Sequence, residues 1–413
     1  MGQSPVKDPH SAAARAGLAP ASSRDTKLRI LIVDPRLATA GYLFSLADAL
    51  ERLTEIEPDL AWSPPARRSY HTGPALALFP RLIPVTDRIR LQGRMVNALC
   101  RLSYERQLSR VLDFAISRRH RAVHFNWSFR PKLELDLVRE LRSRRIPVVY
   151  TAHNPAPHDT SSASEALVAF CRAVDQIVVL TEYVKGRVLE TTGLAPERVT
   201  VIPHGDFSAE IMPPASESAG TTPFAGHRKV ACLGAIRPYK GVPDLLKAWP
   251  RVLEACPDAR LIIAGTLRWA ARAEVREALR RLGPIRRSVH TEFEYLSGEK
   301  YSRHLQSATV LVQPYRSASQ SGNTVHAYGK GIPVVCTRVG GLAEAIDEGR
   351  TGSVAEPGDP DALAEAIVRI LQLNRSGELA RDCRALHRER YSWQGIAAAH
   401  QDLYRSLTHT GAA

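Results

Sequence analysis

The segment from Pro314 to Gly341, PYRSASQSGNTVHAYGKGIPVVCTRVGG, holds the densest group of small polar residues in the chain. It follows an apolar run and leads into a helical pattern. A loop of this kind presents unpaired backbone N–H groups and the positive end of a helix dipole, which suits a phosphate or diphosphate group. A turn of small residues before a helix is also common in proteins where no anion binds. The residues expected to bind the anion are Gln320, Ser321, Gly322, Asn323 and Thr324, with additional hydroxyl donors at Ser321 and Thr324.

Two cations stand in a second segment, Gly234 to Gly241 (GAIRPYKG), directly after a predicted strand. Arg237 and Lys240 lie on a tight turn, from which they can point into a cleft and neutralise a leaving pyrophosphate. The alternative is an ordinary surface turn that carries two basic residues. Taken together, the two segments favour a phosphorylated ligand.

A third segment, TAHNPAPHD (residues 151–159), follows a predicted strand of the first half and is therefore expected at the mouth of a cleft. His158 and Asp159 have the chemistry of a general base and its orienter for an attacking hydroxyl group. Asp159 is equally suited to cap the helix that follows. Asn154, in the same loop, is a candidate contact for the acceptor of the reaction.

Further candidates for the acceptor side are Asn126 and Trp127, which with His124 end another predicted strand. A Trp beside an Asn suits the face of a sugar, although core packing explains a Trp at least as well. Gly41 is expected in the first strand-to-helix loop, PRLATAG. This loop lacks the GxGxxG pattern, which disfavours a nicotinamide or flavin dinucleotide. Because no Asp-x-Asp stands in a loop that would hold a divalent metal, we expect neither a metal nor a cofactor.

Strands and helices alternate along the chain, which predicts parallel βαβ units. The expected strands are residues 27–35, 122–125, 146–151, 176–180 and 199–202, then 229–233, 260–264, 309–313 and 333–336. The expected helices are 39–53, 132–144, 162–173 and 182–190, then 242–254, 274–282, 324–330 and 360–373. Residues 208–228, rich in Pro, Gly, Ser and Thr, predict a linker. The predicted fold class is therefore α/β, with two doubly wound Rossmann-like domains (28–207 and 229–390) facing a central cleft.

The composition is that of a globular protein: of 413 residues, 44% are hydrophobic and 24% charged. No apolar run approaches the roughly 20 residues that a membrane-spanning helix needs. Residues 1–27 lack the apolar core of a secretory signal and are typical of a disordered leader, so we expect a cytoplasmic protein. The six cysteines are scattered singly, which disfavours a zinc or redox site.

Several motifs together resemble the large family of nucleotide-sugar-dependent glycosyltransferases (group 1) with the GT-B fold. They are GAIRPYKG, RLIIAG, PYRSASQSG, GKGIPVVCTRVGGLAEAI and the ending RYSWQGIAAAHQDLYRSL. The resemblance implies that Arg237 and Lys240 contact the diphosphate of the donor, that the amides around Ser321 and Gly322 cap it, and that His153 lies near the transferred sugar. A histidine that bonds only to its own loop is the alternative for His153. The resemblance also implies a close approach at Gly340 and Gly341, a helix beginning at Glu344, and a last helix, 391–413, that crosses back to the first domain.

The sequence departs from the commonest pattern of this family at three positions. Two glutamates that stand eight positions apart in the family fall on Ala318 and His326 here. The chain therefore resembles a branch, PYxxAxQSG, in which Gln and Ser replace the acid, and His326 is expected to face the donor. The usual arginine is replaced by Ala235, so Arg237 is expected to substitute for it.

The resemblance implies an enzyme that moves a hexose from a nucleotide diphosphate sugar to a glycolipid, lipid-linked or exopolysaccharide acceptor. GDP-mannose is the preferred donor, with UDP-sugars next. Alternatives are a UDP-sugar-dependent enzyme with a small-molecule acceptor, and a nucleotide-sugar epimerase on the same fold. The missing glutamate pair argues against a glycogen-type synthase. A basic module that binds nucleic acid is suggested only by the net charge of +14 and lacks any supporting motif.

The positive charge is concentrated in the first half, where residues 81–145 contain sixteen Lys or Arg against six Asp or Glu. Within residues 80–113, Arg90, Arg94 and Arg101 border apolar residues that include Leu108 and Leu112. This arrangement is typical of a helix that lies in a membrane interface. An anionic membrane surface is therefore a candidate partner, and the alternative is an amphipathic helix packed on the first sheet.

Overall fold

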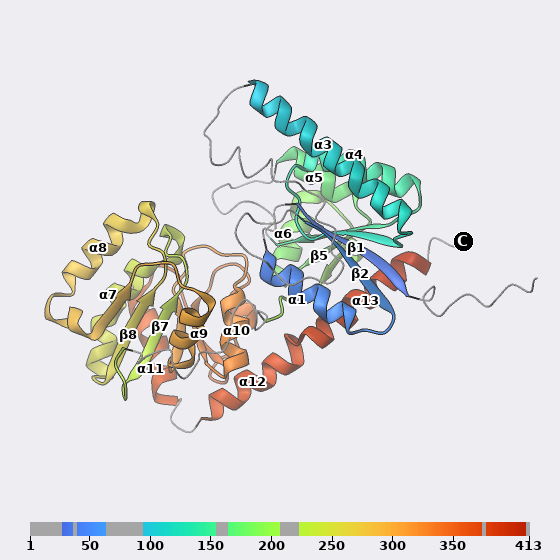
Figure 1. Ribbon diagram of the computed structural model, residues 1–413. Coiled ribbons are helices and arrows are strands. Elements are labelled where there is room, and N and C mark those ends of the chain that lie inside the picture. The colour runs from blue at the N-terminus through green and yellow to red at the C-terminus, as the bar shows by residue number, and fades with distance from the viewer. Residues whose placement is uncertain are drawn as a thin grey trace, which may run out of the picture.

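The computed structural model describes residues 27–35, 39–62, 94–153, 164–206, 223–373 and 377–409, with side chains omitted for 94–100. Two α/β domains stand side by side, and the last helix joins the second to the first (Figure 1). The prediction of two Rossmann-like domains is confirmed by two six-stranded sheets in which every strand pair is parallel.

The N-terminal sheet has the order β2-β1-β3-β4-β5-β6. Its strands are β1 (Leu28–Asp34), β2 (Ile56–Trp62), β3 (Ala122–Phe125), β4 (Val148–Ala152), β5 (Gln176–Val179) and β6 (Val199–Val201). Its helices are α1 (Ala40–Glu51), α3 (Arg94–Ser117), α4 (Pro131–Ser143), α5 (Glu165–Ala173) and α6 (Glu182–Thr192). Aliphatic runs suit strands that are covered on both faces. Alternate residues of β1 accordingly enter two different cores, one beneath α1 and the other beneath α3 and α4.

The C-terminal sheet has the order β12-β11-β10-β7-β8-β9, the strand order of dinucleotide-binding domains. Its strands are β7 (Arg228–Leu233), β8 (Ala259–Ala264), β9 (Val289–Glu292), β10 (Val310–Gln313), β11 (Val334–Thr337) and β12 (Gly352–Ala355). Its helices are α7 (Val242–Ala255), α8 (Arg272–Arg281), α9 (Gly298–Gln306), α10 (Gly322–Lys330), α11 (Pro360–Leu373) and α12 (Glu378–Arg390). Helices α7, α8 and α11 cover one face, and α9, α10 and α12 cover the other.

Helix α13 (Trp393–His409) runs back along the N-terminal domain and packs beside α1 (Figure 1). Ile396, Ala397 and Tyr404 are buried in the N-terminal core. The Tyr404 hydroxyl group lies 2.7 Å from Nδ1 of His124 in β3. None of the helices in the described residues is both long and apolar enough to cross a bilayer.

The structure differs from the sequence prediction in several elements. Strands β2, β9 and β12 and helices α9 and α12 were not predicted, because polar residues interrupt their apolar patterns. Gly41 lies in the first turn of α1, not in the preceding loop, because the helix already begins at Ala40. Strand β7 begins at Arg228, one residue before the start of the predicted strand. Most of the expected leader and linker lie outside the described residues.

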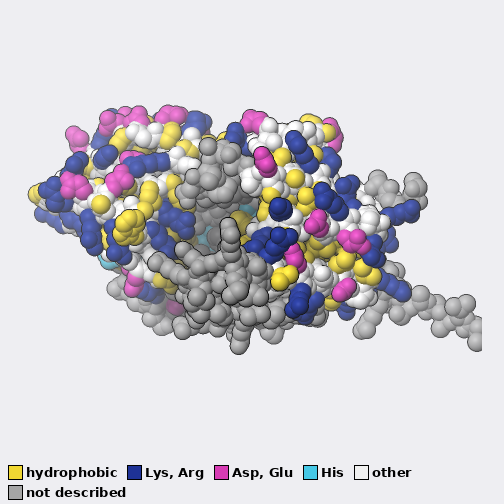
Figure 2. Space-filling model, turned by 90° about the horizontal axis from the view of Figure 1, so that it is seen from above, with side chains coloured by type: hydrophobic (Ala, Val, Ile, Leu, Met, Phe, Trp, Pro, Cys, Tyr) yellow, Lys and Arg dark blue, Asp and Glu magenta, His cyan; other side chains and the backbone are white. Residues whose placement is uncertain are grey.

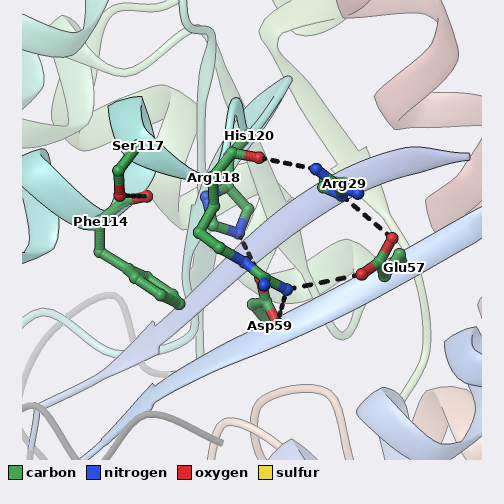
Figure 3. A network of polar contacts seen from close by, with 7 residues as sticks. All are labelled: Arg29, Glu57, Asp59, Phe114, Ser117, Arg118 and His120. Carbon is green, nitrogen blue, oxygen red and sulfur yellow. Dashed lines mark hydrogen bonds and ion pairs between the residues drawn. The ribbon is translucent and has the colours of Figure 1, made fainter. Parts of the chain in front are cut away.

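A charged network explains why β2 is a strand despite its polar sequence (Figure 3). Asp59 in β2 is only 2% exposed, and its carboxylate lies 2.9 Å from Nε2 of His120 and 3.2 Å from Nε of Arg118. At its edge, Arg29 in β1 donates to Glu57 at 3.0 Å. Burial alone would raise the pKa of Asp59, but the contacts with His120 and Arg118 outweigh it and lower that pKa. Arg118 and His120, from the segment between α3 and β3, therefore compensate the buried charge of Asp59.

We expect Asp59→Asn to lower the free energy of unfolding at pH 7 by about 1–3 kcal/mol, because His120 and Arg118 lose their charged partner. The pKa of Asp59 is lower in the folded protein than in the unfolded one, so ionised Asp59 stabilises the fold at pH values above its unfolded pKa, which is about 4. This stabilisation is lost as the pH falls through the folded pKa. Urea denaturation between pH 3 and 7 should therefore show a weaker pH dependence in the variant. Asp48→Asn is the control, since Asp48 pairs with Arg52 on the surface. An equal loss in both variants would contradict a special role of the network.

Candidate active site

The two neighbouring strands β7 and β10 mark the switch point of the C-terminal sheet, where ligands of such sheets bind. The loops that follow these strands meet there. The backbone N–H of Arg316 donates to the Tyr239 carbonyl at 2.7 Å. Gly241 has φ +63°, and a Cβ atom at this position would lie 1.7 Å from the Pro314 carbonyl oxygen. Only glycine therefore lets the two loops approach so closely.

Lys240 is held in this loop pair by aromatic residues. Its Nζ lies 2.5 Å from the Tyr315 hydroxyl group and 3.8 Å from the centre of the Tyr315 ring, and the Tyr239 ring centre is 5.6 Å away. Burial disfavours the charged form, but Tyr315 and Tyr239 raise the pKa of Lys240 above its usual value overall. The half-buried ammonium group is thus oriented and protonated. Arg237, which was predicted to act with it, is exposed at the start of the same turn.

Helix α10 begins at Gly322, and the Ser321 side chain does not cap it. The Gln313 side chain instead bridges the loop: its Nε2 donates to Ser321 Oγ at 3.0 Å, and its Oε1 accepts from Thr324 Oγ1 at 2.9 Å. Thr324 is only 2% exposed. The expectation that its hydroxyl group serves as an anion donor needs correction, because its hydrogen is committed to Gln313. Backbone N–H groups at the helix start are left as the main donors.

Asn323 was also predicted to bind the anion, but its Nδ2 contacts the Leu233 carbonyl at 3.4 Å and so ties α10 to the end of β7. Gln320 and Ser321 line a cavity of about 320 Å³ between the two domains. Thr181, Glu182 and His204 of the N-terminal side line the same cavity. The predicted anion loop therefore faces the other domain.

The glycine pair behind this loop allows the two domains to touch. A Cβ atom on Gly341 would lie 2.6 Å from Thr181 Oγ1 of the N-terminal domain, and Gly340 has φ +51°. Glu344 does not begin a long helix. It lies in the short 3₁₀ turn Ala343–Ala345, and its carboxylate accepts from the backbone N–H groups of Glu182 and Tyr183 at 2.8 and 2.6 Å. It therefore caps α6 across the domain boundary, an arrangement that residue spacing does not reveal.

His326, predicted to face the donor, is 1% exposed and takes part in a second contact between the domains. Its Nδ1 lies 2.6 Å from Oδ1 of Asp206, at the end of the N-terminal domain. The other carboxylate oxygen of Asp206 lies 3.5 Å from Nε2 of His387 in α12. Burial would raise the pKa of Asp206, but both histidines lower it well below its usual value. At least one nitrogen of His326 is thus directed to Asp206 and not to a ligand.

On the N-terminal side of the cleft, His153 directly follows β4 and is 5% exposed. The Trp127 ring stacks on it with centres 5.6 Å apart, and the Tyr42 ring meets it edge-on at 5.0 Å. Burial, with a smaller effect of His204, lowers the pKa of His153 to about 3, against an opposing contact with Asn126. His153 is therefore neutral at physiological pH.

Asn126 was predicted to contact the acceptor, but it is fully buried. Its Oδ1 lies 3.3 Å from His153 Nε2, and its Nδ2 donates to Asp34 at 2.9 Å. Neither Asp34 nor Tyr42 was predicted as a site residue, although Asp34 is a polar residue at the carboxyl end of an apolar strand. Asn154, His158 and Asp159 lie outside the described residues.

Comparison with known proteins agrees with this arrangement. The family described as glycosyl transferases group 1 matches residues 227–373, and glycosyltransferase family 4 matches residues 41–205. A D-inositol 3-phosphate glycosyltransferase of Corynebacterium urealyticum is 30% identical over 182 residues, which cover 43% of each chain. In eight curated relatives that this chain matches, the matched part spans between 43% and 66% of the relative's length.

Solved structures share the fold over nearly the whole chain. Sucrose-phosphate synthase from Thermosynechococcus elongatus superimposes with a TM-score of 0.67 at 18% identity, covering 93% of this chain and 100% of that one. HepE of Anabaena in complex with UDP gives a TM-score of 0.66 at 16% identity, covering 92% and 100%. At such identities the likeness concerns the fold alone.

Proposed function

We propose that this chain, which belongs to the group 1 glycosyl transferases with the GT-B fold, transfers a hexose from a nucleotide diphosphate sugar to a hydroxyl group of an acceptor. The observation that carries the proposal is the switch point of the C-terminal sheet. There the oriented cation of Lys240 contacts Tyr315, in the loop that leads from β10 to the start of α10. Across the cleft, His153 is buried in an aromatic setting on the other domain.

In the proposed reaction, the bond between the anomeric carbon and the diphosphate oxygen breaks, and the acceptor oxygen forms the new bond to that carbon. The acceptor proton passes to a base, and nucleoside diphosphate leaves. Lys240 and the α10 amides stabilise the charge that develops on the leaving diphosphate. His153 is a weak base because its pKa is about 3, so we assign it a hydrogen bond near the sugar. His158 with Asp159 remains the proposed base.

For the donor we propose GDP-mannose, on the PYxxAxQSG motif, with a UDP-sugar as the second candidate. The UDP bound to Anabaena HepE supports that second candidate only through a shared fold. The test is to incubate the protein with GDP-mannose, UDP-glucose and UDP-N-acetylglucosamine and to follow the release of nucleoside diphosphate. Release from GDP-mannose supports the first candidate, and release from a UDP-sugar alone replaces it. If calorimetry detects binding of neither GDP nor UDP, the proposed function is wrong.

For the acceptor we propose a glycolipid, a lipid-linked sugar or an exopolysaccharide. A small phosphorylated acceptor is the second candidate, because the name of the Corynebacterium urealyticum relative specifies D-inositol 3-phosphate. Assays with lipid extract and with D-inositol 3-phosphate, each with the donor found above, separate the two. Radiolabel that moves into the organic phase supports a lipid acceptor, whereas a water-soluble product supports the small one.

We also propose that the protein lies against an anionic membrane surface, through α3. In its described part, Tyr104, Leu108 and Val111 pack into the N-terminal core, so Leu108 is not part of a membrane-facing surface. Arg101, Arg106 and Arg110 are exposed on the same helix. Lys and Arg side chains are prominent on this side of the N-terminal domain, among acidic and hydrophobic ones (Figure 2). The attraction from this part of α3 would therefore be electrostatic.

We expect the triple variant Arg101→Gln, Arg106→Gln and Arg110→Gln to bind anionic vesicles at least about tenfold more weakly, since each Arg near the surface contributes roughly 1 kcal/mol. Co-sedimentation with vesicles of phosphatidylglycerol and phosphatidylcholine, at low and high salt, measures this. The matched control replaces Arg272, Arg276 and Arg280, which α8 exposes on the other domain. The proposal fails if the parent protein does not bind at low salt, or if the control variant loses binding equally.

A further inference from the structure

A chain of three buried polar side chains ends at His153. Asp34 closes β1, Asn126 follows β3, and His153 follows β4. These strands are neighbours in the parallel sheet, so their carboxyl ends meet at one edge, the edge that faces the cleft. Asp34 and Asn126 are 0% exposed and His153 is 5% exposed, which removes all three from free exchange with water.

The orientation of the Asn126 amide is fixed by its neighbours. Its Nδ2 donates to Asp34 Oδ2 and to Thr39 Oγ1, both at 2.9 Å. An ionised carboxylate only accepts hydrogen bonds, so a reversed amide would place two acceptor oxygens against each other. Asn126 Oδ1 must therefore point the other way, toward Nε2 of His153 at 3.3 Å. An amide oxygen also only accepts, so the hydrogen in this contact belongs to His153.

The packing around His153 restricts rotation of its ring. It stacks on Trp127 at an interplanar angle of 28° and meets Tyr42 at 90°. A ring packed in this way keeps one nitrogen toward Asn126. In a neutral imidazole, a hydrogen on Nε2 leaves Nδ1 with a lone pair.

We propose that Asp34 and Asn126 are positioning residues, which hold His153 in the tautomer protonated at Nε2 and so leave Nδ1 to accept a hydrogen bond from a hydroxyl group of the bound sugar. The inference rests on the proposed function, since the sugar belongs to the donor or the acceptor of that reaction. His153 then acts as an acceptor of fixed direction. The two positioning residues touch neither substrate.

The decisive variant is Asp34→Asn, which keeps the size of the side chain. Its amide can turn either an oxygen or a nitrogen toward Asn126, so Asn126 loses its fixed orientation and His153 is expected to populate both tautomers. Ring nitrogen chemical shifts of the full chain labelled with ¹⁵N-histidine, with His153 identified by its loss in His153→Gln, report the tautomer directly. We expect protonated Nε2 in the parent protein and averaged shifts in the variant. Release of nucleoside diphosphate should fall about 10- to 100-fold in kcat, with the KM for the donor within about twofold.

Asp59→Asn is the matched control, because it removes a buried aspartate from the neighbouring strand β2 that bonds to His120. It should leave the His153 shifts and kcat unchanged. Asn126→Leu tests the middle of the chain and should change the His153 shifts in the same sense as Asp34→Asn. Parent shifts that show Nδ1 protonated, or unchanged shifts in both Asp34→Asn and Asn126→Leu, would overturn the inference. The shifts are measured without substrate, so they test the positioning of His153 by Asp34 and Asn126 even if no nucleotide sugar is consumed. In that case the proposed function and the sugar contact fail, whereas the tautomer assignment depends on the shifts alone.

Discussion

Lys240→Ala is expected to weaken the binding of nucleoside diphosphates by about 10- to 150-fold, the largest effect on binding that we expect from a single substitution. The side chain is half-buried between Tyr239 and Tyr315, which keep it protonated and fix the direction of its ammonium group. A charge that is already oriented loses little entropy when a diphosphate binds, so most of its attraction contributes to affinity. Arg237→Ala should have a smaller effect, because the Arg237 side chain is exposed to water and screened by salt.

Titration calorimetry with GDP and with UDP measures this effect. Lys247→Ala is the matched control: it removes the same charge from α7 of the same domain, where Lys247 pairs with Asp244 at 3.8 Å. Tyr315→Phe removes the hydrogen bond between the Lys240 ammonium group and the hydroxyl group but keeps the ring beside that cation, so we expect a smaller loss of affinity than in Lys240→Ala. If Lys240→Ala binds both nucleotides as tightly as the parent, the diphosphate does not lie at this loop.

The sequence predicted the elements whose stability depends on their own residues. Strand β3 was predicted at Ala122–Phe125, where the structure has it, because a short aliphatic run suits a strand covered on both faces. Strand β2 was missed because Pro58, Asp59 and Glu57 interrupt its pattern. Its buried acid is compensated by Arg118 and His120, some 60 residues further along the chain. Local sequence therefore identifies a strand only where the strand needs no distant partner.

The same limit applies to the candidate site. The small residues before α10 and the cations of GAIRPYKG were recognisable because each forms a local structure, a helix start and a turn. The bridge from Gln313 to Ser321 and Thr324, and the contact of His326 with Asp206, depend on side chains that only the folded chain brings together. Residue type alone thus indicated that Thr324 and His326 are polar and near the site, but not which partner they bind.

His153→Ala is expected to lower turnover about 10- to 100-fold while the affinity for the donor changes less than about twofold, because the residue lies on the domain opposite the proposed diphosphate site. Since its pKa is about 3, His153 does not titrate between pH 5 and 9, and the pH profile of kcat in this range should keep its shape in the variant. Steady-state release of nucleoside diphosphate against donor concentration, repeated across this pH range, separates the two parameters. The control His409→Ala removes an exposed histidine at the end of α13 and should behave as the parent does. If turnover stays within about twofold of the parent, His153 only packs against Trp127 and Tyr42. If the pH profile of kcat changes in the variant, His153 carries a proton in the reaction.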